Sequence, residues 1–425
     1  MLEQILDRRQ LEKALVTVER NKGAGGVDDM QSDELRQFIS TNYQQLCEKV
    51  LSGTYRPDPV RMVEIPKPQG GVRMLGIPTV KDRLLQTAVC QWLEPQVDKN
   101  FHRNSYGFRP GRNAHQAVKA AEGFLNEGYD WIIELDLEKF FDRVSHAKLL
   151  AILGKTISDK RIMRLVKLWL KGGIMAGGIV SPRTEGTPQG SPLSPLLSNI
   201  LLNELDKTLD SRGHRFVRYA DDCSIYVKSE KAAKRVMEVI VNYLENGLAL
   251  KVNKEKSKIS RPQESYLLGF SFFKQEEKYQ IRVAPKSLER IRKKCREITK
   301  SSDPSNARIK LNKLDQIIRG WVNYFSIAKS KKALQNLDKM VRTRLRINAW
   351  RRWKRIKTKF KNLVQLGVKP QKAYEWANTS KSACRISHSF VLATTLNNAY
   401  WRKKGYRGFS LYYEWKTAAP TLNFN

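Results

Sequence analysis

The chain has 425 residues and a formal net charge of +36, and 41% of its residues are hydrophobic. This hydrophobic fraction argues against a disordered chain, and the length favours two or three domains. A cationic excess of this size predicts a polyanionic partner, above all nucleic acid, because unneutralised cations repel one another.

The positive charge is concentrated in the last third of the chain. Residues 281–425 hold 35 basic and 7 acidic residues, a net of +28, whereas residues 1–280 hold a net of +8. The last third is therefore typical of a phosphate-binding region. A solvated basic face without a partner is the alternative.

Cysteines and targeting signals indicate the compartment. The five cysteines are far apart and form no Cys-x-x-Cys pair, which argues against a disulfide framework or a structural zinc finger and fits a reducing cytosol. The N-terminal segment has no apolar signal core, and no apolar run approaches the roughly 20 residues that span a bilayer. We expect a cytoplasmic protein without a membrane partner.

The first 130 residues combine helical periodicity with one hairpin pattern. The expected elements are helices near 2–20, 32–51, 79–97 and 113–127, a glycine-rich turn at 21–28, and a hairpin over 60–78 that turns at Pro68-Gln-Gly-Gly71.

Strands are expected next, where β-branched and aromatic residues follow one another. The expected elements are strands at 131–137 and within 216–227, helices near 159–171, up to about 211 and over 231–246, and short strands over 266–283. From about 286 the pattern predicts helices rich in Lys and Arg. A domain boundary is expected near 280–285, where the charge steps up.

Three carboxylates stand at the ends of apolar strands. Asp136 ends the run Ile132-Ile-Glu-Leu-Asp136, and Asp221 and Asp222 form the tip of an apolar hairpin. Adjacent carboxylates there are costly unless a proton or a cation relieves their repulsion. Such oxygens suit Mg²⁺, and two ions roughly 3.5–4 Å apart can activate a hydroxyl and stabilise a leaving pyrophosphate. A solvated Asp-Asp turn is the alternative for the pair.

The sequence around these carboxylates resembles reverse transcriptases, in particular the bacterial group II intron class. The segments that carry the resemblance are VEIPKPQGGVRMLGIPTVKDRLLQ (63–86), SYGFRPGRNAHQAV (105–118), ELDLEKFFD (134–142), GTPQGSPLSPLLSNI (186–200), Tyr219-Ala-Asp-Asp222, LKVNKEKSKI (250–259) and LLGFSF (267–272). Their order is far more specific than Tyr-Ala-Asp-Asp alone. No His-Asn-His cluster or cysteine pair follows residue 360, so the chain resembles the compact class that lacks an endonuclease domain.

The resemblance implies an α+β right-hand polymerase fold, with fingers and a palm built on an antiparallel sheet, a helical thumb and a small basic C-terminal domain. The implied domains are an N-terminal extension with fingers (1–90), the palm with the remaining fingers segments (91–283), a maturase X-like thumb (284–360) and a basic DNA/RNA-binding domain (361–425).

Catalytic and metal-binding roles are implied for Asp136, Asp221 and Asp222, and Leu137 is counted with them at the metal site. Asp136 and Asp221 would bind both ions, and Asp222 would complete the set. The implied cofactor is a pair of Mg²⁺ ions, with Mn²⁺ as an alternative.

Cations on the 60–78 hairpin are implied to bind the nucleotide. Lys67 and Arg73 would hold the triphosphate of the incoming dNTP, and Arg61 would contact template or nucleotide. Exposed cations on a hairpin that serve only solubility are the alternative.

Further nucleotide contacts are implied beside the strands. Phe141 would lie under the sugar and exclude a 2′-hydroxyl, while Phe140 is expected in the core. Gln189 would contact the template–nucleotide pair, and Gly190 would let the backbone approach closely. Lys256 is a weaker candidate for assisting pyrophosphate departure.

Two more segments resemble family features. The glycine turn at 21–29 resembles an extension that covers the template strand, and Leu268-Gly269-Phe270 resembles the grip on the primer end. An ordinary loop and a β-bulge are the alternatives.

The basic helices divide into packing faces and nucleic-acid-binding faces. Residues 308–326 carry an apolar stripe that predicts core, and residues 341–359 carry nine basic residues and no acidic one, as a helix along a duplex backbone would. Residues 361–425 interleave aromatics with cations, which suits structured RNA. The resemblance implies that this region helps to bind intron RNA and to promote splicing.

The expected function is RNA-directed DNA synthesis combined with maturase activity and intron mobility. The expected partners are an RNA template, a DNA or RNA primer, dNTP, group II intron RNA and target DNA, with nucleoid association when DNA is bound. Two alternatives remain: an RNA-binding splicing factor without polymerase activity, and a domesticated reverse transcriptase in phage defence or DNA repair.

Overall fold

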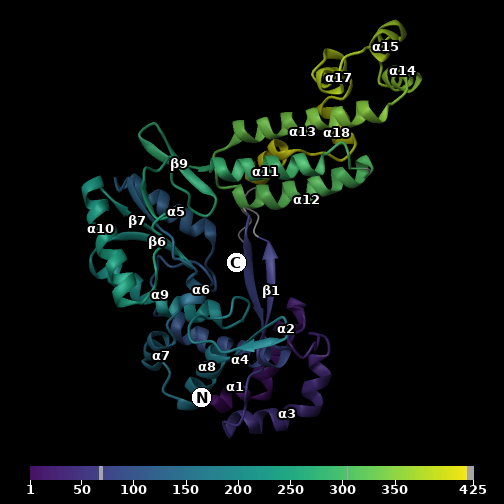
Figure 1. Ribbon diagram of the computed structural model, residues 1–425. Helices are drawn as coiled ribbons and strands as arrows, with labels where there is room; N and C mark the ends of the chain where they lie inside the picture. The colour runs from purple at the N-terminus through teal and green to yellow at the C-terminus, as the bar shows by residue number, and fades with distance from the viewer. Residues whose placement is uncertain (67–69, 304, 419–425) are drawn as a thin grey trace. The chain divides into compact units, whose positions relative to one another are not determined.

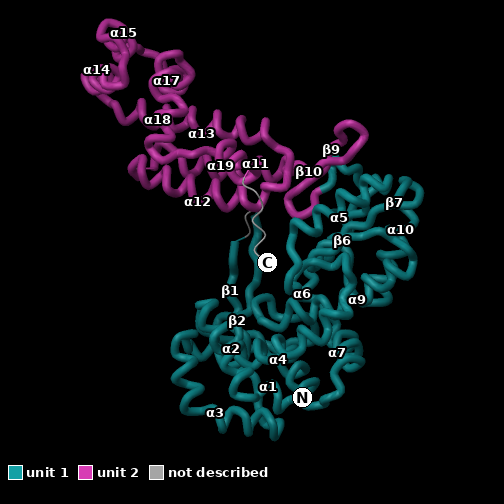
Figure 2. The backbone as a smooth tube through the Cα atoms, turned by 180° about the vertical axis from the view of Figure 1, so that it is seen from behind, with its two compact units in different colours: residues 1–265 teal, residues 266–425 magenta. Residues whose placement is uncertain are grey.

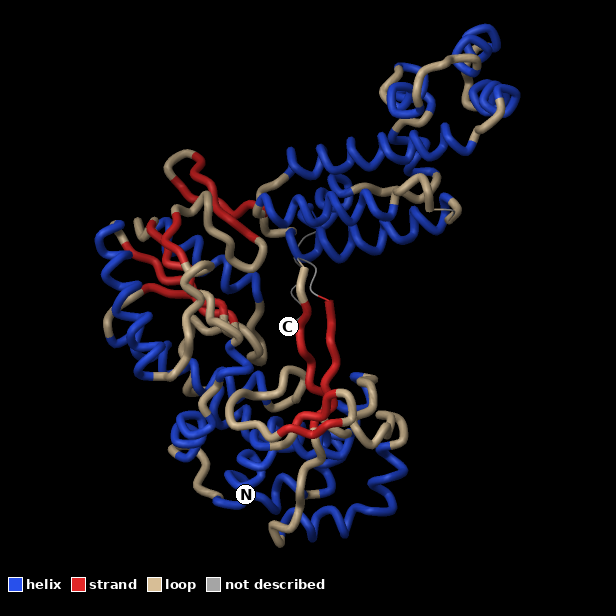
Figure 3. The backbone as a smooth tube through the Cα atoms, in the orientation of Figure 1, coloured by secondary structure: helices blue, strands red, loops and turns tan. Residues whose placement is uncertain are grey.

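The fold was analysed in a computed structural model, which describes residues 1–66, 70–303 and 305–418. The chain forms two compact units, Met1–Ser265 (unit 1) and Tyr266–Asn425 (unit 2), shown in different colours in Figure 2. Figure 3 shows that strands are confined to unit 1 and to one hairpin of unit 2 within the described residues.

The helix predicted over 2–20 is two helices, α1 (Leu2–Leu6) and α2 (Arg8–Asn21). Asp7 leaves the helical region with ψ of 140°, and its side chain accepts a hydrogen bond from the Arg9 amide at 2.9 Å. Asp7 thus begins a new helix inside a continuous apolar stripe, because an Asp side chain can cap a helix start. The single-helix prediction is wrong at this point.

Helices make up most of unit 1. The others are α3 (Leu35–Leu51), α4 (Val80–Asp98), α5 (Ala114–Asn126), α6 (Phe140–Arg143), α7 (His146–Gly154), α8 (Lys160–Lys171), α9 (Ser194–Ser211) and α10 (Glu230–Asn242), which a π-helical turn extends over Tyr243–Gly247. Several start at the side-chain caps that their sequences offer, for instance Thr79 before α4 and Asn113, in a capping box, before α5.

Two four-stranded sheets lie in unit 1. The first has the order β2-β1-β4-β5 and contains the predicted hairpin, β1 (Val60–Pro66) and β2 (Val72–Ile77), with β4 (Ile174–Ala176) and β5 (Ile179–Ser181) added beside β1. The second has the order β6-β7-β3-β8 and is antiparallel throughout. Its strands are β3 (Trp131–Leu135), β6 (Arg215–Tyr219), β7 (Asp222–Val227) and β8 (Lys258–Ser260).

Helices pack against the second sheet and fix its position (Figure 1). Both α5 and α10 contact its strands, and the ring of Phe124 on α5 lies 5.7 Å from that of Tyr226 on β7. Alternate residues such as Ile133, Leu135 and Ile225 enter the main core of the unit. The sheet therefore provides a rigid platform whose strand ends carry the three carboxylates.

A buried carboxylate ties the helices of unit 1 together. Asp82 accepts hydrogen bonds from the Tyr55 hydroxyl at 2.8 Å, the Trp169 indole at 2.9 Å, the Thr79 hydroxyl at 2.9 Å and the Asp58 amide at 3.1 Å. Burial raises the pKa of Asp82, and these donors oppose that rise. A buried acid with this many donors is a structural anchor.

Unit 2 is a helical unit that begins with one hairpin. Its elements are β9 (Phe270–Gln275), β10 (Lys278–Val283), α11 (Pro285–Ile298), α12 (Ala307–Phe325), α13 (Lys331–Arg352), α14 (Ile356–Gln365), α15 (Pro370–Ala377), α16 (Ala383–Ser387), α17 (Phe390–Thr395), α18 (Asn398–Lys403) and α19 (Phe409–Ala418). The hairpin joins this unit because Gly269 accepts hydrogen bonds from the Ala284 amide and the Ser287 hydroxyl, at 3.0 and 2.9 Å. The division of the chain thus falls before the boundary predicted at 280–285.

One core runs through unit 2. It contains Leu314 and Ile318 of α12, as the apolar stripe predicted, and also Leu363, Leu392 and Phe409 from the region after residue 360. The ring of Trp321 packs edge-on against Phe409 with centroids 5.7 Å apart. The helices after residue 360 therefore share a core with α11, α12 and α13 in the described part of the chain.

The predicted α+β class with an antiparallel sheet is confirmed by the second sheet, whereas the first sheet is mixed, because β1 and β4 pair in parallel. Across the described ranges, no helix has the length and apolar character needed to cross a membrane.

Candidate active site

The three carboxylates lie at one end of the second sheet. In the antiparallel register Leu135 of β3 pairs with Cys223 of β7, so Asp136 and Asp222 occupy the next opposing positions. Asp221 precedes Asp222 in the tight turn between β6 and β7, where Tyr219 pairs with Asp222. Residues 85 positions apart in the sequence are thus adjacent in the structure, as the strand pattern predicted.

Lost hydration, and then repulsion from neighbouring carboxylates, disfavour the charged forms of Asp221 and Asp222. Burial, and then the charge of Asp136, raise the pKa of Asp221, while Arg73 and Arg218 lower it. Partial loss of hydration, followed by the charges of Asp221, Asp136 and Glu134, raises the pKa of Asp222 to about 6, although its side chain still reaches solvent. A raised pKa at clustered acids marks a site that gains energy when a cation enters.

Asp136 is held mainly through its backbone. Its amide donates to the Ser257 hydroxyl at 3.0 Å, and its carbonyl accepts from the Asn253 amide at 2.8 Å. Its carboxylate lies 3.5 Å from the ammonium of Lys256, which is exposed. Ser257 and Asn253 were not singled out from the sequence, although both lie in the 250–259 segment.

The carboxylates are close but are not already gathered around one point. In the described part of the chain, no three His, Cys, Asp or Glu side chains form a group ready to hold a metal ion. The donor set nevertheless fits a divalent cation, because it consists of hard oxygens, the pKa values of Asp221 and Asp222 are raised, and the exposed Lys256 pairs with Asp136 alone. A cation would replace that ammonium and draw the oxygens together.

The turn that carries Asp221 has an unusual backbone. Ala220 has φ of 57°, in the left-handed backbone region that residues other than glycine rarely adopt. Gly107 makes close contact with the Ala220 backbone, and a Cβ on Gly107 would collide with it. The motif Ser-Tyr-Gly-Phe-Arg-Pro-Gly thus supports the carboxylate turn, a role that its sequence alone did not reveal.

A fully buried arginine stabilises the same turn from behind. Arg218 donates to the Ala220 carbonyl at 2.9 Å, to both carboxylate oxygens of Asp206 at 2.7 and 2.6 Å, to Asn199 at 2.9 Å and to the Ser105 hydroxyl at 2.7 Å. The guanidinium and its carboxylate partner are both inaccessible to solvent. Sequence reasoning missed Arg218, and its only signal was a charge within the apolar run FVRYADD.

The Pro188-Gln189-Gly190 segment lies against the first sheet. The Gly76 amide of β2 donates to the Gln189 carbonyl at 2.7 Å, and a Cβ on Gly190, whose φ is 120°, would stand 2.6 Å from the Gly76 carbonyl. Gly190 permits close backbone approach here, and the backbone that approaches it is that of Gly76. This contact joins the hairpin to the segment predicted to touch the nucleotide.

Phe140 and Phe141 separate as predicted. Phe140 is buried in the core, whereas Phe141 is only partly buried and meets Phe140 edge-on at 5.2 Å. The Phe141 carbonyl accepts a hydrogen bond from the Thr187 amide at 2.6 Å. The backbone at Phe141 thus connects the Asp136 segment with the 186–192 segment.

The hairpin cations have different surroundings. Arg73 is exposed, and its charge is close enough to Asp221 to lower the pKa of that carboxyl. Arg61 donates to Asp29 at 2.7 Å and to the Gly26 carbonyl at 3.3 Å, so it contacts the glycine turn at 21–29. Lys67 lies outside the described residues.

The predicted primer-end segment belongs to unit 2. Leu268 has φ of 51°, and its carbonyl accepts a hydrogen bond from the Tyr324 hydroxyl at 2.8 Å. Its role at a primer end stays a prediction.

Part of the basic surface predicted over 341–359 is turned inward. Arg344 donates to the Thr299 hydroxyl at 2.7 Å, and Arg346 donates to the Leu396 carbonyl at 3.1 Å. Burial lowers the pKa of both guanidinium groups. These two arginines therefore hold the helices of unit 2 together, and others remain for a ligand.

Comparison with known families assigns two regions of the chain. Residues 65–272 match the reverse transcriptase (RNA-dependent DNA polymerase) family, and residues 288–367 match the group II intron maturase-specific domain.

Individual relatives agree with these matches. The chain is 34% identical to Protein YkfC of Escherichia coli over 309 residues, which is 63% of this chain and 81% of that protein. It is 37% identical to the group II intron-encoded protein LtrA of Lactococcus lactis over 190 residues, which is 44% of this chain but 31% of LtrA. A solved partial Cas6-RT-Cas1–Cas2 complex matches 57% of this chain and 42% of that chain, with 24% identity and a TM-score of 0.38.

Proposed function

This chain belongs to the group II intron reverse transcriptase family of RNA-directed DNA polymerases, and on that premise we propose that Asp136, Asp221 and Asp222 form its polymerase site. Reverse transcriptase domains depend on divalent metal ions and act on nucleic acid templates. The proposal specifies which residues bind the metal ions, which ion they bind and which nucleic acids are the partners.

One observation carries the proposal. Asp136 follows a strand whose register with β7 puts it opposite Asp222, while Asp221 lies in the adjoining turn. Burial, together with the charges of neighbouring carboxylates, raises the pKa values of Asp221 and Asp222, and a divalent cation would offset both effects. Structural acids in the same unit, such as Asp82 and Asp206, instead have full sets of hydrogen-bond donors.

The three carboxylates, with Leu137 beside them, would hold two Mg²⁺ ions. When bound, such ions activate a primer 3′-hydroxyl and neutralise the leaving pyrophosphate. The protein's own contribution is positioning: Ser257 and Asn253 hold the Asp136 backbone, and Arg218 holds the Asp221 turn. Mn²⁺ is the alternative ion.

The nucleotide would lie between the carboxylates and the hairpin. Arg73, together with Lys67, binds the triphosphate, and Phe141 lies under the sugar and rejects a 2′-hydroxyl. Gln189 contacts the template–nucleotide pair. The contact of Arg61 with Asp29 supports a template-side role for the glycine turn.

Unit 2 would bind RNA. Its 37 basic and 9 acidic residues, together with the maturase-specific match, support a role in holding group II intron RNA during splicing and target DNA during intron mobility. We assign fingers to 1–90, palm to 91–283, thumb to 284–360 and the nucleic-acid-binding end to 361–425. We propose that the protein acts in the bacterial cytoplasm and on nucleoid DNA.

Primer extension tests the polymerase site. The full chain is given a labelled DNA primer on an RNA template with dNTP and Mg²⁺, and is compared with the variant that combines Asp221→Asn and Asp222→Asn. Extension by the variant should fall at least about a thousandfold, because several kcal/mol of transition-state stabilisation are lost. Affinity for RNA should stay within about twofold, since those contacts lie elsewhere.

A matched control uses another adjacent carboxylate pair at a hairpin tip. Glu276→Gln with Glu277→Gln removes two exposed charges from the β9–β10 turn. This control should extend primers at the parent rate. Continued extension by the aspartate variant, or equal loss in both variants, would refute the site.

A further inference from the structure

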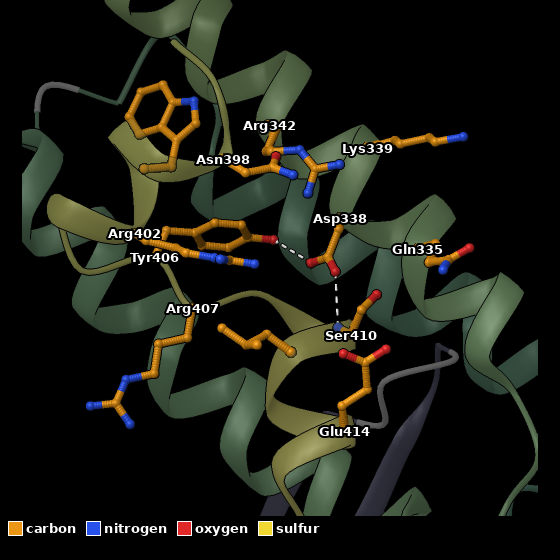
Figure 4. A pocket seen from close by; sticks show the side chains of 12 residues that line it. Gln335, Asp338, Lys339, Arg342, Asn398, Arg402, Tyr406, Arg407, Ser410 and Glu414 are labelled. Carbon is orange, nitrogen blue, oxygen red and sulfur yellow. Dashed lines mark hydrogen bonds between the residues drawn. The ribbon is translucent and has the colours of Figure 1, made fainter.

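A polar pocket lies wholly within unit 2, between α13 and the elements that follow α17. Its volume is about 300 Å³, and Figure 4 shows the side chains that line it. Lys339 and Arg342 come from α13, whereas Arg402 and Arg407 come from α18 and the loop after it. The last two lie outside both regions that match known families.

The acidic groups of the pocket are already satisfied. Asp338 accepts hydrogen bonds from the Tyr406 hydroxyl at 2.8 Å and from the Phe409 and Ser410 amides at 2.8 and 2.9 Å, so it caps the first turn of α19 (Figure 4). Glu414 forms an ion pair with Lys331 at 3.0 Å. Asp338 keeps its negative charge, but its oxygens already accept three hydrogen bonds, and the charge of Glu414 is paired with Lys331.

The basic groups of the pocket are not satisfied. Within the described ranges, none of Lys339, Arg342, Arg402 or Arg407 forms an ion pair or a hydrogen bond with another side chain. Four cations line the pocket against the two charges of Asp338 and Glu414, so the lining has a positive excess that an anion would offset.

Two uncharged donors at the pocket are also unused. The indole nitrogen of Trp401, a residue only 5% exposed, and the Ser410 hydroxyl are buried without a hydrogen-bond partner. A buried donor without an acceptor costs about 1–3 kcal/mol, so such groups indicate a missing partner. The groups of the pocket that lack partners are therefore almost all hydrogen-bond donors.

We infer that this pocket binds a phosphodiester group of the nucleic acid strand held by unit 2, an inference that rests on the proposed function. A phosphodiester supplies one negative charge and oxygens that only accept hydrogen bonds, which matches the unused donors and cations. The positive excess of the lining disfavours a metal ion here. RNA and DNA strands both carry this group, and the experiment separates them.

The test measures the affinity of the full chain for a labelled RNA stem-loop and for a DNA hairpin of the same sequence, over a range of salt. The pocket variant combines Arg342→Gln with Arg402→Gln, and the control combines Lys293→Gln with Lys294→Gln, two exposed lysines of α11. The pocket variant should bind at least about tenfold more weakly, with a salt slope lower by about 1. The control should lose about twofold or less in affinity, because it only lowers the overall positive charge of the protein.

Ser410→Ala separates binding from stability. Removing an unpaired buried hydroxyl from a helix should leave the thermal midpoint unchanged or raise it. The same change should weaken strand binding about two- to fivefold, because one donor to the phosphodiester is lost. A structural role for Ser410 predicts a lower midpoint with unchanged affinity, and that result would overturn its place in the site.

The outcomes also separate this inference from the proposed function. A loss with RNA alone assigns the pocket to an RNA strand, and a loss with DNA alone assigns it to a DNA strand. If the parent protein binds RNA and extends primers while pocket and control variants lose affinity equally, the pocket inference fails and the proposed function stands. If the parent neither binds RNA nor extends primers, both fail.

Discussion

Unit 1 gathers three carboxylates at the end of one sheet, where Asp136 pairs with the exposed Lys256, whereas unit 2 gathers four cations around one pocket. Unit 2 also has the larger cationic excess, with 37 basic and 9 acidic residues against 41 and 33 in unit 1. Each unit also contains a buried acid whose partners are complete, Asp206 with Arg218 in unit 1 and Asp338 with Tyr406 in unit 2.

The comparison separates two uses of charge within one chain. A charged group with a complete set of partners stabilises the fold, because removing one partner leaves the other buried and unpaired. A charged group without partners is costly to the fold and is explained by a ligand of opposite sign. The sign of the unsatisfied set then indicates the ligand: divalent cations for unit 1 and phosphodiesters for unit 2.

The largest expected effect comes from removing Arg218. Arg218→Met leaves Asp206 buried without its ion pair, so the free energy of unfolding of unit 1 should fall by about 3–5 kcal/mol. Hydrogen exchange of the β6 and β7 amides in urea measures it. Arg215→Met on the same strand removes a half-exposed pair with Glu127 and should cost less than about 1 kcal/mol. An equal loss of unfolding free energy in the Arg218 and Arg215 variants would contradict the distinction between charges with a complete set of buried partners and other charges.

Asp338→Asn probes the corresponding group in unit 2. Losing the charge at the start of α19 should lower the free energy of unfolding of unit 2 by about 1–3 kcal/mol and leave unit 1 unchanged. Protease sensitivity of residues 409–418 is the measurement. Asp315→Asn, which removes a surface pair with Arg319 on α12, should cost about 0.5 kcal/mol. A uniform loss in both units would mean that the acid does not anchor α19 locally.

Phe141→Ala tests whether the unsatisfied carboxylates adjoin a nucleotide. Discrimination between dNTP and rNTP, measured as the ratio of their kcat/KM values, should fall at least about tenfold, or about 1.4 kcal/mol. The ratio cancels any loss of folded protein. Tyr374→Ala, which changes an exposed aromatic of unit 2, should leave the ratio unchanged. An unchanged ratio in the Phe141 variant would assign the sugar gate to another residue.

The smallest expected effect is a pH dependence confined to unit 1. Burial lowers the pKa of both His146 and His214, and nearby Arg183 and Lys171 add to the effect at His146 while the Gly186 carbonyl and Glu185 oppose it. A histidine with a lowered folded-state pKa contributes stability above its unfolded value of about 6.5 and loses it as the pH falls towards the folded value.

Thermal unfolding between pH 7.5 and 5.5 measures this loss. The midpoint of unit 1 should fall by a few degrees more in the parent than in the variant that combines His146→Gln with His214→Gln. Taking the difference cancels the carboxylates that titrate in the same range. A similar difference in the midpoint of unit 2 would contradict the assignment to these two histidines.

The sequence located the carboxylates because their signals are local. Asp136 ends an apolar strand and Asp221 sits in a turn between two others, and antiparallel pairing then brings them together. Phe140 was recognised as core and the apolar stripe of α12 as a packing face for the same reason. The hydrophobic pattern over a few neighbouring residues indicates which side chains face the core.

The sequence could not reveal groups whose partners are distant. Arg218 meets Ser105, which is 113 positions away, and Asp338 meets Ser410, which is 72 positions away. The three-residue strands β4 and β5 were missed because they are too short to give a pattern of their own: β4 is held by pairing with β1, and β5 by pairing with β4. Helix α7 was also missed, although Ser145 offered a cap signal before it.

The anchoring of α19 on Asp338 has a consequence for the nascent chain. Ribosomes synthesise a protein from its N-terminus, so Asp338 emerges long before Tyr406, Phe409 and Ser410. Until they appear, Trp321 and the acid remain uncovered, while unit 1 already has every residue of its own core. Folding during translation therefore finishes the polymerase half first and closes the basic half only when its last helix arrives.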